Sequence, residues 1–113
     1  MCSQTTLNII TDKVVQAVRE SLGDKLDRVI LYGSYARGDY DDESDIDIMV
    51  LADIPRESCP DEYEKLNQLI SRLGLEYDIL VTVNLTDCAT FNRFISDLPF
   101  YANVQREGVV LSA

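Results

Sequence analysis

Histidine is absent from this 113-residue chain, and cysteine is scarce. Without an imidazole, the chain cannot build histidine-ligated zinc, a serine–histidine–aspartate triad or an imidazole acid–base pair. The three cysteines, Cys2, Cys59 and Cys88, are odd in number and widely spaced, which fits reduced thiols better than a disulfide framework or a zinc site. Any catalysis must therefore depend on carboxylates and metal ions.

Long apolar runs and basic residues are also lacking. No segment approaches the roughly 18 consecutive apolar residues of a membrane span, and residues 1–6 lack the features of a signal peptide. We therefore expect a cytoplasmic protein that does not enter a membrane. Ten basic against twenty acidic residues give a formal charge of −10, which repels nucleic acid and favours metals, cationic substrates or a basic protein partner. We expect no direct nucleic-acid binding.

The apolar pattern predicts alternating helices and strands in a single domain, 1–113. With 46% apolar residues, a chain of this length can bury one core but not two. Helical spacing and capping signals predict the helices, and short apolar runs predict the strands. The expected helices cover 5–22, 60–74, 86–96 and 99–108, with one or two turns in 33–38, and the expected strands cover 28–32, 45–51, 76–83 and 109–111.

The second expected strand begins with alternating carboxylates. A period of two places Asp45 and Asp47 on one face and Ile46 and Ile48 on the other. Two such carboxylates repel each other by about 1 kcal/mol in water and about 4 kcal/mol at an intermediate dielectric. A cation between them would relieve this repulsion, so the pair predicts the beginning of a metal site.

A third carboxylate is expected from the strand predicted over 76–83. Asp78 enters an otherwise apolar run, where an unpaired charge is costly, and Glu76 shares its parity as the competing candidate. If this strand lies beside the second one, Asp78 joins Asp45 and Asp47 in a three-carboxylate cluster. Three carboxylates suit magnesium or manganese and can hold two ions when a substrate phosphate bridges them.

Gly33 and Ser34 follow the first expected strand and precede Asp45 by ten residues. A glycine at a strand end permits a sharp turn and close backbone approach, and amides at the start of the next short helix point toward an anion. Ser34 adds a hydroxyl donor, and Arg37 can direct its planar guanidinium toward the same anion. Together these groups predict a triphosphate site.

Each feature has a simpler interpretation when it is taken alone. A Gly-Ser pair after a strand is more often a turn and helix cap, and an Asp-x-Asp is usually a solvated strand end. Asp78 could pair with a basic residue, and Arg37 could form only a surface ion pair. Their joint occurrence at consecutive strand ends, in this order, favours the functional interpretation.

The segment from Gly33-Ser-Tyr-Ala-Arg-Gly38 through Ser44-Asp-Ile-Asp-Ile48 resembles the signature of the DNA polymerase β-like nucleotidyltransferase superfamily. The short chain and its final segment, 99–111, resemble the minimal nucleotidyltransferase branch. This resemblance implies an α/β (α+β) fold, a mixed sheet with helices packed on it. It also implies transfer of a nucleoside monophosphate from a nucleoside triphosphate to a hydroxyl.

The resemblance also implies roles for the candidate residues. Asp45 and Asp47 would bind two magnesium ions, and Asp78 would complete the metal site and assist deprotonation of the acceptor. Gly33 and Ser34 would hold the β- and γ-phosphates of the nucleotide, which we expect to be ATP.

Within the minimal branch, the resemblance implies an antitoxin of a type VII toxin–antitoxin pair. Such an antitoxin would transfer AMP from ATP to a tyrosine of a partner HEPN-domain ribonuclease toxin. The chain is not itself expected to be the toxin, because those ribonucleases share an Arg-x4-His motif and this chain has no histidine. Two alternatives stay open: a small-molecule, aminoglycoside-type nucleotidyltransferase and a non-catalytic antitoxin that acts by binding alone.

Overall fold

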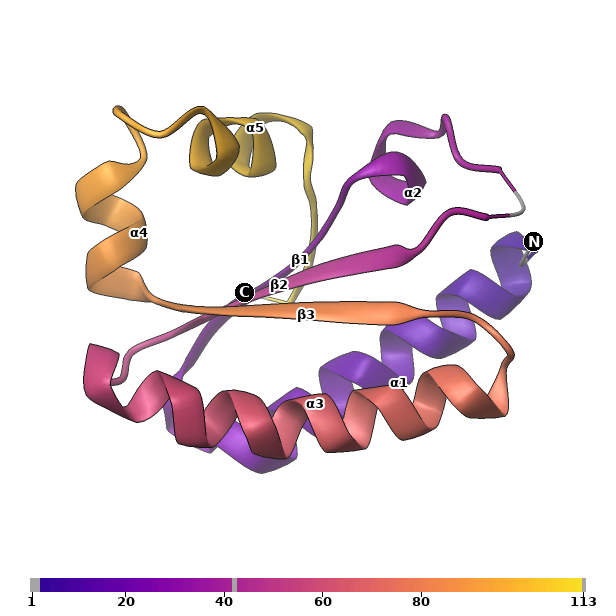
Figure 1. Cartoon of the computed structure of the whole chain (residues 1–113), viewed down its shortest axis with the longest axis horizontal. Helices are drawn as coiled ribbons and strands as arrows, with labels where there is room; N and C mark the ends of the chain where they lie inside the picture. Colours follow the sequence, from indigo (N-terminus) through magenta and orange to yellow (C-terminus); the bar gives the residue numbers. More distant parts are fainter. Residues whose placement is uncertain (1–2, 42, 113) are drawn as a thin grey trace.

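A single four-stranded sheet organises the computed structural model, which describes residues 3–41 and 43–112 (Figure 1). The strand order is β3-β2-β1-β4. The strands are β1 (Leu26–Tyr32), β2 (Ile46–Ala52), β3 (Val81–Asp87) and β4 (Val109–Ser112). β1 runs antiparallel to β2 and β4, whereas β3 runs parallel to β2. The sheet is therefore mixed, as expected from the resemblance.

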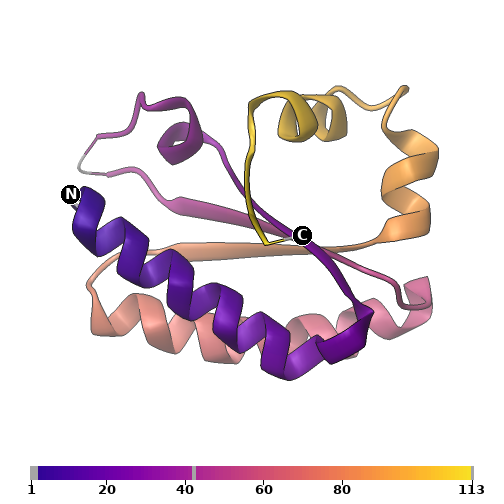
Figure 2. The same cartoon turned by 180° about the vertical axis from the view of Figure 1, so that it is seen from behind.

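Two long helices, α1 (Gln4–Leu22) and α3 (Cys59–Glu76), cover one face of the sheet (Figures 1 and 2). α1 begins where the Ser3 side chain accepts a hydrogen bond from the Thr6 amide, which satisfies one of the free amides of its first turn. The larger core lies between these helices and the sheet, so alternate strand residues must be apolar there. Its fully buried members include Ile10, Val14, Val18, Ile46, Ile48, Val50, Leu66 and Ile70.

The opposite face is only partly covered, by α4 (Cys88–Phe94) and α5 (Pro99–Glu107) (Figure 1). A smaller core holds these helices to the sheet. The short helix α2 (Ser34–Arg37) follows β1, and two 3-10 turns lie at Gly23–Lys25 and Arg56–Ser58. The smaller core consists of Ile30, Met49, Leu51, Phe91 and Val104.

Most element predictions are confirmed, but the third strand begins later than expected. The helices expected over 5–22 and 99–108 and the strand expected over 109–111 correspond to α1, α5 and β4. The strand expected over 76–83 is wrong at its start, because α3 continues to Glu76 and β3 begins only at Val81. Residues 77–80 instead form the turn between them.

Asp78 occupies a helix-terminating position in this turn. The Asp78 amide donates to the Leu75 carbonyl at 3.3 Å, and the Ile79 amide donates to the Gly74 carbonyl at 3.0 Å. This pair of hydrogen bonds is the Schellman arrangement, which needs a residue in the left-handed region just beyond the helix. Asp78 supplies it with a φ of 54°. The αL residue is therefore Asp78 and not Gly74, where the sequence predicted the helix end.

Gly74 lies inside the last turn of α3 because the chain folds back across it. A β-carbon at Gly74 would overlap the carbonyl oxygen of Ile79. Glycine is the one residue that leaves room for this crossing. The glycine therefore marks the site of the crossing and not the end of the helix.

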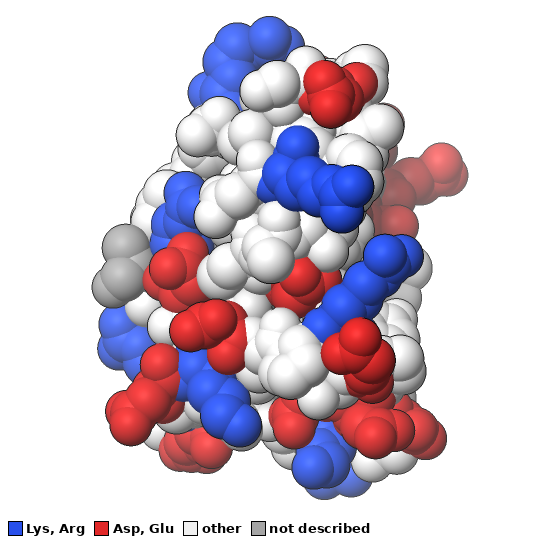
Figure 3. All heavy atoms as spheres, turned by 90° about the vertical axis from the view of Figure 1, so that its left-hand side faces the viewer, with Lys and Arg blue, Asp and Glu red and all other residues white. Residues whose placement is uncertain are grey.

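Charged side chains of both signs are interspersed on the face that Figure 3 shows, which is the left-hand side of Figure 1. Nucleic-acid binding proteins instead collect Lys and Arg into a stripe or patch. Within the described ranges, 3–41 and 43–112, no helix combines the length and apolar character needed to cross a lipid bilayer.

Candidate active site

Asp47 lies near the start of β2, between Tyr32 of β1 and Thr82 of β3 in the sheet. Its side chain shares the strand parity of Met49 and Leu51, so it faces the α4 and α5 side. Thr82 Oγ1 donates a hydrogen bond to Asp47 Oδ1 at 2.6 Å. The carboxylate is thereby held in place while remaining partly exposed.

The glycine of the Gly-Ser motif is required by this same carboxylate. A β-carbon at Gly33 would overlap Asp47 Oδ2, and Gly33 also has a φ of 76°. Because of both features, any residue other than glycine would be destabilising at this position. The Gly33 carbonyl accepts hydrogen bonds from the amides of Ala36 and Arg37, each at 3.1 Å. The turn into α2 therefore closes directly against Asp47, which links the two motifs physically.

A cavity of about 360 Å³, here called the α5 cavity, brings the predicted nucleotide-binding residues together with Asp47. Its residues come from the end of β1 and the adjoining α2, from β2, and from α5, which lies much later in the sequence. Sequence reasoning missed the contribution of α5, although the spacing of its residues places them on one helix face. The α5 cavity is lined by Tyr32, Gly33, Ser34, Arg37 and Asp47, and by Phe100, Asn103, Val104 and Glu107 of α5.

Arg37 forms ion pairs on both sides of its guanidinium group. Its Nε lies 3.1 Å from Asp39 Oδ2, and its Nη1 lies 3.8 Å from Glu107 Oε2. Both pairs are largely exposed, so each contributes little to stability. Their effect is to orient the guanidinium at the edge of the α5 cavity.

Tyr32 contributes a neutral hydroxyl to the same region. Burial raises the pKa of Tyr32, the negative charge of Asp47 raises it further, and a hydrogen bond with Asn84 acts in the opposite direction. Burial and a neighbouring anion both disfavour the phenolate. Tyr32 therefore keeps its proton at neutral pH.

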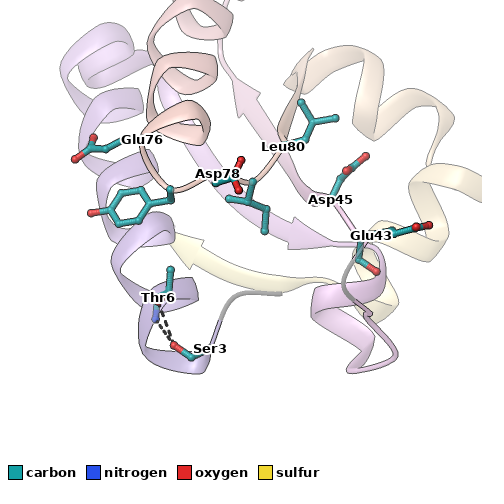
Figure 4. A pocket seen from close by; sticks show the side chains of 10 residues that line it. Ser3, Thr6, Glu43, Asp45, Glu76, Asp78 and Leu80 are labelled. Carbon is teal, nitrogen blue, oxygen red and sulfur yellow. Dashed lines mark hydrogen bonds between the residues drawn. The ribbon is translucent and has the colours of Figure 1, made fainter.

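Asp45 lines a different and larger cavity of about 730 Å³, here called the acidic cavity (Figure 4). Glu43 and Asp45 lie on the segment before β2, whereas Glu76 and Asp78 lie at the end of α3 and on the following turn, with the Glu76 carboxylate pointing away from the other three (Figure 4). The described residues that line it include four carboxylates and no Lys or Arg. Of the two aspartates of the Asp-x-Asp motif, Asp45 therefore lines the acidic cavity and Asp47 lines the α5 cavity.

The predicted three-carboxylate cluster is not formed. Among residues 3–41 and 43–112, no three Asp, Glu, Cys or His side chains lie close enough to share a metal ion. The reason is that Asp78 ends α3 and is exposed, while Thr82 takes the position beside Asp47 on β3. Glu76, the competing candidate, ends α3 with its carboxylate 3.9 Å from Lys13 Nζ.

Asp45 and Asp47 alone still match a common way of holding magnesium. Proteins often bind this ion through one or two carboxylates, and the remaining ligands are waters and substrate phosphates. Asp45 and Asp47 are half-buried side chains separated by one residue at the edge of the sheet. These two carboxylates fit a magnesium ion that arrives bound to a nucleotide. The predicted set of three carboxylates does not fit, because the described residues do not bring three together.

The sequence also matches a known protein family. A family model described as a nucleotidyltransferase domain matches residues 11–107. The chain belongs to this nucleotidyltransferase family. The match includes Gly33, Ser34, Asp45 and Asp47, so the family assignment covers both halves of the motif.

Known relatives agree with this assignment. The nucleotidyltransferase domain is 44% identical over 80 residues to MJ0141 of Methanocaldococcus jannaschii, a candidate protein adenylyltransferase, covering 71% of this chain and 79% of the relative. Among solved structures, a candidate minimal nucleotidyltransferase shares the fold with a TM-score of 0.65 at 19% identity, over 96% of this chain and 95% of that one. A chain from a toxin–antitoxin structure with AMP-PNP has a TM-score of 0.58 at 23% identity, over 91% and 73% of the two chains.

Proposed function

We propose that this nucleotidyltransferase transfers AMP from ATP to a tyrosine hydroxyl of a HEPN-domain ribonuclease toxin in the cytoplasm, with release of pyrophosphate, and so neutralises the toxin. The observation that carries the proposal is the close approach of Gly33 to Asp47, in a cavity that Ser34 and Arg37 also line. The candidate adenylyltransferase relative supports AMP transfer to a protein. The toxin–antitoxin neighbour with AMP-PNP supports the partner class and the nucleotide.

In this proposal, the chain's own residues bind and orient the nucleotide. Ser34 donates its hydroxyl to a phosphate oxygen, the Gly33 turn allows the backbone to approach the phosphates, and Arg37 supplies a positive charge. Asp45 and Asp47 would hold magnesium, with Thr82 fixing the orientation of Asp47. The chemistry that bound magnesium supplies is neutralisation of phosphate charge and a lower pKa for the attacking hydroxyl.

We place the acceptor in the acidic cavity beside Asp45. Glu76 is paired with Lys13, and the other three carboxylates of this cavity would attract a positively charged segment around the acceptor hydroxyl. Asp78, across this cavity, would assist by orienting the acceptor or receiving its proton. A basic surface is what an RNA-cutting toxin needs, because it must bind phosphates. The same acidic cavity would suit a cationic aminoglycoside, so this alternative needs its own test.

A labelling experiment tests the proposal. The protein is incubated with magnesium and ATP labelled at the α-phosphate, together with the product of the adjacent gene or with kanamycin. We expect label on a tyrosine of the protein partner, no label on kanamycin, and loss of label in Asp47→Asn or with a chelator. Label on kanamycin alone would replace the protein acceptor with a small molecule. Neutralised toxin without label would establish the binding-only alternative.

A further inference from the structure

We infer that α5 forms the nucleobase subsite, with Phe100 as the surface on which the base stacks and Asn103 as the polar contact to its edge. The inference rests on the proposed use of ATP. It assigns a function to a helix that lies about sixty-five residues beyond the Gly-Ser motif.

Phe100 is a rigid aromatic ring that stays accessible. Its ring meets Tyr32 edge-on, with centroids 5.6 Å apart and an interplanar angle of 82°, and lies 5.7 Å from the ring of Tyr101. Two aromatic neighbours therefore restrict its movement. Phe100 is nevertheless 43% exposed. A large apolar side chain held in place at a cavity while open to solvent is characteristic of ligand-binding sites.

The position of Phe100 within the α5 cavity matches the two chemical ends of a nucleotide. Ser34 and Arg37 supply the polar and charged groups that suit phosphates, and both line the same cavity as Phe100. A nucleotide whose phosphates lie at these groups extends its base away from them toward an apolar or aromatic wall. Tyr32 is the more buried aromatic residue of this cavity. Phe100 therefore offers the exposed ring.

Asn103 lies one turn after Phe100 on the same face of α5 and lines the same cavity. Arg106 Nη2 donates a hydrogen bond to Asn103 Oδ1 at 2.7 Å, which fixes the orientation of the amide. The Asn103 amide keeps its Nδ2 donor and a second lone pair on Oδ1, and these groups match the N7 acceptor and the N6 donor of adenine. The subsite is therefore expected to prefer adenine over guanine.

Binding of ATP and of inorganic tripolyphosphate, both measured calorimetrically with magnesium, tests the inference. Because aromatic stacking on a base is strong, Phe100→Ala should weaken ATP binding roughly tenfold or more. Tripolyphosphate has no base, so its affinity should stay unchanged. Phe100→Tyr should retain ATP binding, which keeps the test informative even if the alanine variant folds poorly. Asn103→Ala should reduce the preference for ATP over GTP.

Leu75→Ala is the matched control, because Leu75 is 83% exposed on α3 and lies outside the α5 cavity. It should bind ATP like the wild type. Equal loss of ATP and tripolyphosphate in Phe100→Ala would make Phe100 a structural residue and overturn the inference. Unchanged ATP binding by Phe100→Ala would also overturn the inference, and would be expected if Phe100 contacts the protein partner instead of the base. Those two results leave the proposed function standing, whereas a wild type that binds neither ligand would overturn both.

Discussion

Thr82 Oγ1 donates a hydrogen bond to Asp47 Oδ1 at 2.6 Å, joining β3 to β2 at the candidate active site. The other carboxylate oxygen, Oδ2, is the one that a β-carbon at Gly33 would meet. Asp47 is therefore positioned from two sides, by a hydroxyl donor and by a glycine. A metal ligand that is fixed in this way loses little conformational freedom when it binds an ion.

Removing the Thr82 hydroxyl should impair the metal site more than the fold. Thr82→Val keeps the side-chain shape but removes the donor, so we expect magnesium affinity and AMP transfer to fall roughly 10-fold to 100-fold. Loss of one hydrogen bond should lower the free energy of unfolding by about 1 to 2 kcal/mol. Thr82→Ser is the control and should retain magnesium binding, measured calorimetrically. Equal magnesium affinity in all three proteins would exclude a positioning role for Thr82.

Two glycines with similar backbone angles separate strain from contact with Asp47. Gly33 and Gly38 have φ values of 76° and 86°, but a β-carbon at Gly38 would meet nothing within 4 Å. Gly38→Ala should therefore lose about 1 kcal/mol of stability to backbone strain while retaining transfer. Gly33→Ala should lose more stability and most of its transfer, because the new methyl group displaces the Asp47 carboxylate.

Urea unfolding and the labelling assay measure the two quantities for these glycine variants. Similar losses of stability and of transfer in both would show that the approach of Gly33 to Asp47 has no special role.

Asp78 substitutions distinguish a helix end from a metal ligand. Asp78→Gly removes the carboxylate and relieves the left-handed backbone strain, while the greater freedom of glycine in the unfolded chain offsets part of that gain, so stability should stay the same or rise by up to about 1 kcal/mol. Asp78→Ala should lower it by about 1 kcal/mol, because alanine disfavours this conformation. Magnesium affinity should be unchanged in both variants. A magnesium affinity that falls sharply in Asp78→Gly would restore Asp78 as the third metal ligand.

The Tyr32 hydroxyl should titrate at unusually high pH. Its pKa is raised mainly by burial and further by Asp47, so in the folded protein it ionises above the ordinary value of about 10. The unfolded chain loses this proton first, so Tyr32 contributes stability that is present below about pH 10 and is lost as pH rises through the folded pKa.

Ultraviolet difference titration of the wild type against Tyr32→Phe isolates this tyrosine from the others. In Asp47→Asn, the Tyr32 pKa should fall, because the negative charge of Asp47 no longer raises it and only burial still does. A Tyr32 pKa that does not respond to Asp47→Asn would show that the two groups do not interact.

The sequence predicted the parts of the site that depend on neighbouring strand ends. Gly33 ends up against Asp47 because β1 and β2 are adjacent and antiparallel, so the end of one strand meets the start of the other. Alternation along β2 also predicted correctly that Ile46 and Ile48 face away from Asp47 and into the larger core. These outcomes follow from strand geometry, which local sequence encodes.

The position of Asp78 could not be predicted in the same way. The apolar residues before β3 suit a helix end as well as a strand, and periodicity cannot separate the two over so short a stretch. Tertiary packing decided it: the chain crosses over Gly74, and Asp78 takes the left-handed position. The contribution of Phe100 to the α5 cavity could not be predicted either, because α5 comes to lie at the end of β1 only in the folded chain.

Transfer of AMP by the wild type and by Asp47→Asn, compared at equal concentration with magnesium, labelled ATP and the toxin partner, tests the central claim most directly. Asparagine keeps the size of the side chain and can still accept a hydrogen bond from Thr82, so the fold should persist. We predict that transfer falls at least about 100-fold, because a metal-binding charge is lost at the reacting phosphate. Transfer at the wild-type rate by a folded Asp47→Asn protein would contradict the account.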